Sequence, residues 1–171
     1  MSLYKKYIVP FISDPQKLFW LYITVNMLPS IFLLFSEPFN VWGKIVLILF
    51  PLGLYLFVLS IFKKTGLIQL ILFPLLFLHA FQLVLLYLFG EDVIAVDMFL
   101  NVVTTNPSEA GEVLNSLWPS VVFVCIVYIP TTIIAIRQIR KKIYLQAGFQ
   151  RKAILSGVAL LFISYVFTFF L

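Results

Sequence analysis

Five long apolar blocks divide the sequence and limit the folds open to it. They run from Leu18 to Phe35, Val41 to Phe62, Gly66 to Phe89, Leu117 to Ile136 and Ala153 to Leu171. Each has roughly 18–24 residues, and a helix of that length crosses the hydrocarbon core of a bilayer, about 30 Å thick. Backbone groups in lipid must be satisfied within the segment, so the blocks predict helices rather than barrel strands. We expect an all-α integral membrane protein, a bundle of five transmembrane helices in one domain.

The composition agrees with this expectation. The chain is 63% hydrophobic and 11% charged, whereas a soluble domain is about half apolar and a quarter charged. The single histidine and single cysteine are too few for a zinc site with three or four such ligands. We therefore expect neither a cofactor nor a metal site in this chain.

The basic residues predict the orientation in the membrane. Eleven of the twelve Lys and Arg residues precede the first block or follow the second and fourth: Lys5, Lys6, Lys17, Lys63, Lys64, Arg137, Arg140, Lys141, Lys142, Arg151 and Lys152. Only Lys44 falls on the other side if all five blocks span. The positive-inside rule then places the N-terminus in the cytoplasm and the C-terminus outside. The net charge of +5 thus indicates contact with anionic membrane lipids and no nucleic-acid partner.

The segment from 90 to 116 is the connection richest in polar chemistry, and this topology puts it outside. Asn101, Thr105 and Glu109 follow one another at intervals of four residues, which would put them on one face of a helix. Pro107 disfavours an unbroken helix, so we expect a break near Asn106, with Asn106 capping the helix that follows. A bend there still allows the three side chains to converge. Glu109 has two open interpretations, a capping-box acid and a ligand contact.

An ammonium group fits the chemistry of this segment. The loop is acidic and holds no Lys or Arg, so its field attracts cations and repels simple anions. A carboxylate accepts charge-assisted hydrogen bonds from a primary amine. Phosphatidylethanolamine is the abundant amine-bearing lipid of a bacterial inner membrane, so this lipid is the ligand that we expect.

Two other features of the sequence each allow two interpretations. His79, near the middle of the third block, is either a functional group at mid-membrane depth or a neutral side chain hydrogen-bonded to a neighbouring helix. The connection from 137 to 152 is either an amphipathic segment on the inner membrane surface or a solvated basic loop.

The stretch MFLNVVTTNPSEA resembles the periplasmic segment of membrane-bound phosphoethanolamine transferases, the family that includes the lipid A-modifying enzymes of polymyxin resistance. The matching positions are Met98, Asn101, Thr105, Asn106, Glu109 and Ala110. The order of five helices, with this segment between the third and fourth, is similar as well. Leu100 stands where the family commonly has Gln, which bears on a contact beside Asn101 and on the choice of acceptor.

The resemblance implies more than the residues show. In that family a periplasmic domain of the alkaline phosphatase/sulfatase type follows the helices. It carries zinc and a Thr nucleophile, and transfers phosphoethanolamine from phosphatidylethanolamine to lipid A or another envelope glycan. Asn101, Thr105 and Glu109 would then contact the donor headgroup. This chain would be the membrane domain alone, without catalytic residues or metal ligands of its own.

Two alternatives remain. One is the membrane domain of a glycerophosphate transferase resembling lipoteichoic-acid synthase, although a glycerol headgroup lacks the amine that suits an acidic pocket. The other is a non-enzymatic five-helix scaffold or transporter subunit.

Overall fold

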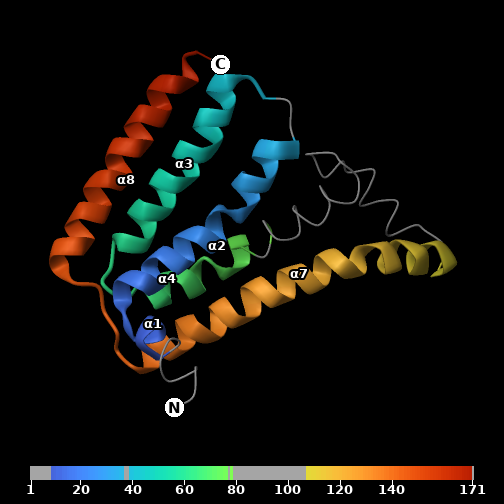
Figure 1. Ribbon diagram of the computed structural model, residues 1–171, viewed down its shortest axis with the longest axis horizontal. Coiled ribbons are helices and arrows are strands. Elements are labelled where there is room, and N and C mark those ends of the chain that lie inside the picture. Colours follow the sequence, from blue (N-terminus) through green and yellow to red (C-terminus); the bar gives the residue numbers. More distant parts are fainter. Residues whose placement is uncertain (1–8, 37–38, 77, 79–106, 171) are drawn as a thin grey trace.

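The computed structural model describes residues 9–36, 39–76, 78 and 107–170, and every regular element among them is a helix. The helices are α1 (Val9–Ser13), α2 (Pro15–Ser36), α3 (Val41–Ser60), α4 (Thr65–Ile71), α7 (Pro107–Arg140) and α8 (Ala147–Thr168), labelled as in Figure 1. The prediction of an all-α protein is therefore confirmed for this part of the chain.

Four of the described helices are long and apolar enough to cross a membrane. These segments are Pro15–Phe35, Val41–Ser60, Val121–Arg140 and Ala147–Thr168. They correspond to the first, second, fourth and fifth apolar blocks. The third block is described only by most of α4 and by the helical residues that follow as far as 78. The count of five spans therefore stays a prediction.

Helices α3 and α8 lie side by side and antiparallel (Figure 1). At one end, the Trp42 ring of α3 stacks on Phe167 of α8 with 5.5 Å between ring centroids. At the other end, Gln150 Nε2 of α8 donates to the carbonyl oxygen of Ser60 at 2.8 Å. Between these ends, Gly53 and Gly157 let the two backbones touch: a Cβ on Gly157 would lie 2.9 Å from the Gly53 oxygen. Small residues of this kind permit close helix packing in lipid.

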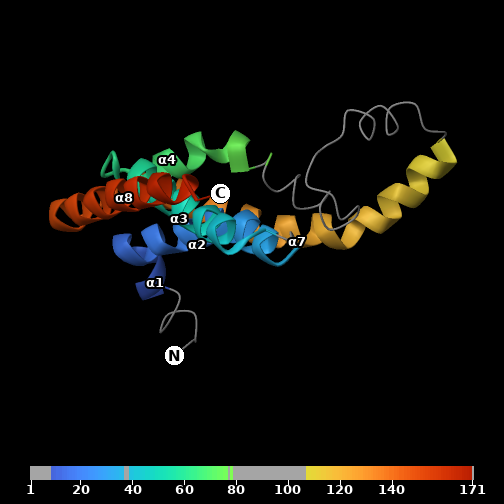
Figure 2. The same ribbon diagram turned by 90° about the horizontal axis from the view of Figure 1, so that it is seen from above.

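Helices α2 and α7 are also antiparallel. Tyr22 near the start of α2 bonds to Gln138 near the end of α7, and Phe32 meets Phe123 edge to face. Helix α7 meets the other helices near its C-terminal end, and from there it extends away at an angle to α3 and α8 (Figures 1 and 2). The apolar core gathers at that shared end, around the fully buried Leu18, Phe19 and Leu59.

Large apolar side chains are exposed along the helices, as lipid contact requires. Examples are Phe50, Ile126 and Phe162, which are 49%, 67% and 68% exposed. In water such surfaces would mark interfaces or aggregation sites, but lipid tails are as apolar as the side chains themselves. The exposed faces thus agree with the membrane assignment drawn from sequence.

The connection between α7 and α8 is short, because both helices extend into the basic stretch 137–152. Helix α7 continues to Arg140, and a Schellman-type end follows: Ile143 N–H donates to the Gln138 oxygen and Lys142 N–H to the Ile139 oxygen. Lys142 takes a φ of 54°, which a non-glycine residue seldom adopts. Leu145, 2% exposed, then points inward, whereas Lys141, Lys142, Tyr144 and Gln146 are exposed, so the connection is mostly accessible and is anchored by one buried side chain.

Candidate functional site

Positive charge is concentrated at one end of the described helices, which we call the basic end. It is formed where α2 and α8 begin, α3 and α7 end, and α4 begins. Nine of the ten described Lys and Arg residues lie there: Lys17, Lys63, Lys64, Arg137, Arg140, Lys141, Lys142, Arg151 and Lys152. Lys44 lies near the start of α3, at the opposite end. The described spans therefore bring basic connections far apart in sequence onto one side.

A buried hydrogen-bond network lies directly beneath the basic end. The Tyr22 hydroxyl donates to Gln138 Oε1 at 2.8 Å. Gln138 Nε2 donates to Thr65 Oγ1 at 2.7 Å and to the Ile143 carbonyl oxygen at 3.2 Å. Tyr22 and Thr65 are fully buried, and Gln138 is 2% exposed. One glutamine thus ties α2, α4 and α7 to the connection before α8.

A second buried pair joins α2 to α4. Asn26 Nδ2 donates to Gln69 Oε1 at 3.1 Å, and Gln69 Nε2 donates back to Asn26 Oδ1 at 3.0 Å. Both side chains are almost fully buried. The two amides satisfy each other, so the pair has the character of a structural link rather than of an open binding site.

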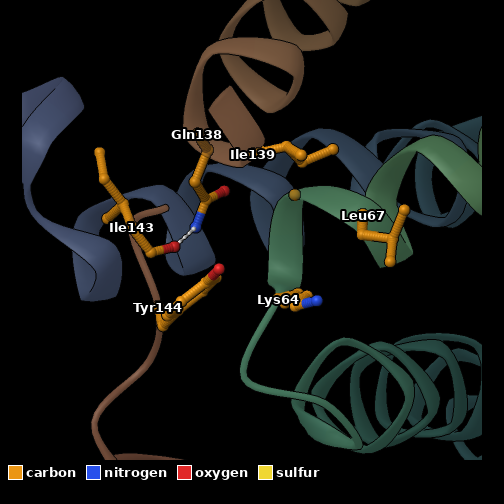
Figure 3. A pocket seen from close by; sticks show the side chains of 7 residues that line it. Lys64, Leu67, Gln138, Ile139, Ile143 and Tyr144 are labelled. Atoms are coloured by element: carbon orange, nitrogen blue, oxygen red, sulfur yellow. Dashed lines mark hydrogen bonds between the residues drawn. The ribbon is translucent and has the colours of Figure 1, made fainter. Parts of the chain in front are cut away.

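A small cleft of about 100 Å³ opens at the basic end. Its walls come from the start of α4, the last turn of α7 and the connection to α8: Lys64, Gly66, Leu67, Gln138, Ile139, Ile143 and Tyr144. In Figure 3 the Tyr144 ring and the Lys64 side chain lie on two sides of the opening, below Gln138. Gly66 is necessary to this arrangement, because a Cβ there would lie 2.8 Å from the Ala135 oxygen.

The headgroup site predicted from sequence falls mostly outside the described residues. Asn101 and Thr105 belong to the undescribed stretch 79–106, as do the helix cap Asn106 and His79. Glu109 is placed by its backbone alone, as the third residue of α7. This is the position of a capping-box acid, and it lies about 18 Å along the helix axis beyond Val121, where the candidate span begins.

The described residues form no metal centre: among them, no three His, Cys, Asp or Glu side chains gather closely enough to hold an ion. The family resemblance places its zinc in a separate periplasmic domain, so this finding does not bear on that expectation.

A comparison with protein families identifies the chain. The family model described as phosphoethanolamine transferase EptA/EptB matches residues 51–171, which is well over half of the sequence. The chain belongs to this family. It is a phosphoethanolamine transferase membrane domain, as the motif around Asn101 and Glu109 suggests. No curated protein and no solved structure was found to match it.

The family match covers both candidate sites of this transferase membrane domain. Residues 51–171 include the whole segment 90–116 and the cleft of the basic end. They leave out α1, α2 and the first half of α3. Tyr22 and Asn26 therefore lie outside the matched region, although their partners Gln138 and Gln69 lie within it.

Sequence reasoning missed the polar network of the transferase domain. The sequence pattern alone assigned no partner to Asn26, Gln69 or Gln138. Helix α2 continues through Pro29, and Asn26 pairs with a residue 43 positions away. The available signal was the isolation of single amides within apolar helices, since such groups in lipid require a partner.

Proposed function

We propose that this domain anchors a phosphoethanolamine transferase in the bacterial inner membrane and binds the donor lipid. The donor is phosphatidylethanolamine, and the ligands of its ammonium headgroup are Asn101, Thr105 and Glu109. The acceptor is lipid A or another envelope glycan, as in enzymes of polymyxin resistance. Membership of the phosphoethanolamine transferase family carries this proposal, and it favours an amine headgroup over the glycerol headgroup of the alternative transferase.

The charge pattern of the helices supports the orientation in this proposal. The basic end would face the cytoplasm and the segment 90–116 would face the periplasm. Glu109 lies near the start of α7 and the basic residues Arg137 and Arg140 near its end. Glu109 therefore lies far from the basic end, whose positive charge would repel an ammonium group.

The residue types indicate which step of the transfer the membrane domain serves and which step a soluble domain serves. A carboxylate beside an amide and a hydroxyl holds and orients an ammonium group. Transfer from a stable diester also needs an activated nucleophile and positive charge at the transferring oxygens. We assign the Thr nucleophile and zinc to a soluble periplasmic domain of the sulfatase type, and donor positioning to the membrane domain.

The test is Glu109→Gln in the full-length transferase. Glutamine still serves at a capping-box position but lacks the charge that attracts an amine. A lost charged hydrogen bond costs on the order of 1.5–3 kcal/mol, so we expect kcat/KM for phosphatidylethanolamine to fall about tenfold or more. Asn101→Ala should lower it in the same direction.

Glu112→Gln is the matched control, because it removes the same charge from the same helix three residues further on. It should leave transfer within about threefold of wild type, since no ligand role is assigned to it. If Glu109→Gln transfers headgroup as well as wild type, Glu109 is a helix cap and the proposed ammonium site is wrong.

A further inference from the structure

The cleft at the basic end offers hydrogen-bond donors and positive charge with no acid beside them. Lys64 and Tyr144, both exposed, carry the ammonium and hydroxyl groups on its walls. Among the described residues, the only ion pair joins Lys17 to Asp14, at 3.9 Å. The charge of Lys64 is therefore not neutralised by any acid in the described part of the chain.

The amide of Gln138, which also lines the cleft, already has hydrogen-bond partners within the protein. Gln138 Nε2 donates to Thr65 and to the Ile143 carbonyl, as the dashed line in Figure 3 marks for the latter. Its amide thus shapes the back of the cleft and leaves ligand binding to Lys64 and Tyr144. Lys63, Arg140 and Lys142 belong to the neighbouring chain segments and raise the local positive potential.

A row of exposed apolar side chains, which we call the apolar track, leads away from the cleft along α4 and the helical residues that follow it. Leu67 lines the cleft, and the exposed side chains that follow it are Ile71, Leu75 and Leu78, at 63%, 41% and 60% exposure. These positions recur on one helix face, and the Leu72 and Leu76 amides continue the helical bonding across the intervening turn. The track provides a path for an acyl chain that starts beside the cations.

We propose that this cleft binds the phosphate of an anionic phospholipid from the leaflet at the basic end. Lys64 Nζ and the Tyr144 hydroxyl donate to the phosphate oxygens, and an acyl chain lies along Leu67 and Ile71. Basic pockets between transmembrane helices at the cytoplasmic side are suited to such headgroups. The volume of about 100 Å³ accommodates the phosphate group alone, with the rest of the lipid outside.

This lipid site is separate from the proposed donor site. Gln138 of the cleft and Glu109 are 29 residues apart on one helix, which is about 44 Å along its axis. The two sites also differ in charge preference, because one is cationic and the other acidic. A variant that abolishes binding at one site therefore leaves binding at the other site testable.

The experiment is a titration of the full chain with phosphatidylglycerol in detergent, followed by native mass spectrometry. One cationic residue near a membrane surface contributes roughly fivefold in affinity for an anionic lipid. Lys64→Gln should therefore weaken binding of the first lipid about fivefold, and Tyr144→Phe should weaken it in the same direction. Both side chains are exposed, so neither substitution removes a core contact.

Lys152→Gln is the control, since it removes an exposed cation from the first turns of α8, outside the cleft. It should change binding by less than twofold. Equal losses in all three variants would mean a diffuse surface potential and would overturn the site. Equally tight binding of zwitterionic phosphatidylcholine would overturn the charge requirement. Displacement of the lipid by an equal concentration of inorganic phosphate would assign the cleft to a free anion instead.

Discussion

At the scale of single residues, the described bundle depends on a few amides placed among apolar side chains. Asn26 and Gln69 exchange two hydrogen bonds between α2 and α4, and Gln138 connects Tyr22 with Thr65. Hydrophobic attraction does not distinguish one apolar helix face from another in lipid, whereas an unpaired amide there is costly. These pairs therefore select which helix faces meet.

A double-mutant cycle on Asn26 and Gln69 tests this role. Asn26→Leu leaves the Gln69 amide buried without a partner, so we expect unfolding in mixed micelles to become easier by about 1–2 kcal/mol. Replacing both residues with Leu removes both polar groups, so the double variant should lose less than the sum of the single variants.

The control for this cycle is Gln146→Leu, which removes an exposed amide that makes no side-chain cap bond. It should shift stability by less than about 0.5 kcal/mol. Strictly additive effects at Asn26 and Gln69 would show that the two amides are not coupled.

At the scale of helices, the pairing of α3 with α8 depends on two glycines. A Cβ on Gly157 would lie 2.7 Å from the Phe57 backbone nitrogen, and one on Gly53 would lie 3.0 Å from the Gly157 oxygen. The groups met are backbone atoms, which cannot turn aside as a flexible side chain does. The two helices therefore cannot approach this closely with larger residues at these positions.

Gly157→Ala should separate α8 from α3. Overpacking of this kind costs about 1–3 kcal/mol, so we expect a lower unfolding temperature in detergent. Gly148→Ala provides a matched comparison in the same helix, because a Cβ there meets no atom within 4 Å. Alanine improves helix propensity by up to about 1 kcal/mol, so this variant should be neutral or slightly more stable. Equal unfolding temperatures for the two variants would contradict the close contact.

At the scale of the whole molecule, the described helices separate charge between two ends. The basic end gathers helix ends that are more than one hundred residues apart, such as the start of α2 with Lys17 and the end of α7 with Arg140. Direct contacts hold them together there: Leu145 N–H donates to the Lys63 oxygen at 3.0 Å, and Phe19 meets Phe149 edge to face. This arrangement is what the positive-inside rule requires of one cytoplasmic surface.

Cysteine labelling tests the orientation in cells. In a Cys125→Ala background, Phe39→Cys should react with an impermeant maleimide added outside, and Lys141→Cys should react only after permeabilisation. Both positions are exposed, whereas Thr65 at the basic end is fully buried, so a thiol there would be silent from either side. External labelling at position 141 would reverse the proposed topology.

The class of fold and the family were predictable from the amino-acid sequence. Lipid leaves the backbone no partners outside the segment, so long apolar blocks such as Val41–Ser60 must be helical. The alternation of basic connections determined which ends of the described helices lie together. The motif around Asn101 and Glu109 indicated the family that the model match confirms. The role of these residues at a headgroup stays a prediction.

The pairing of helix faces and the position of the cleft could not be predicted from the sequence, because they depend on tertiary packing. Two of the deciding contacts join positions far apart in sequence: the hydrogen bond between Asn26 and Gln69, and the close approach of Gly53 and Gly157. The burial of Leu145 likewise depends on packing that the local sequence does not show. In a chain where most faces are apolar, hydropathy is nearly the same for every pairing. The choice depends on interhelical hydrogen bonds and on close packing of small residues, because these are the interactions that lipid cannot replace.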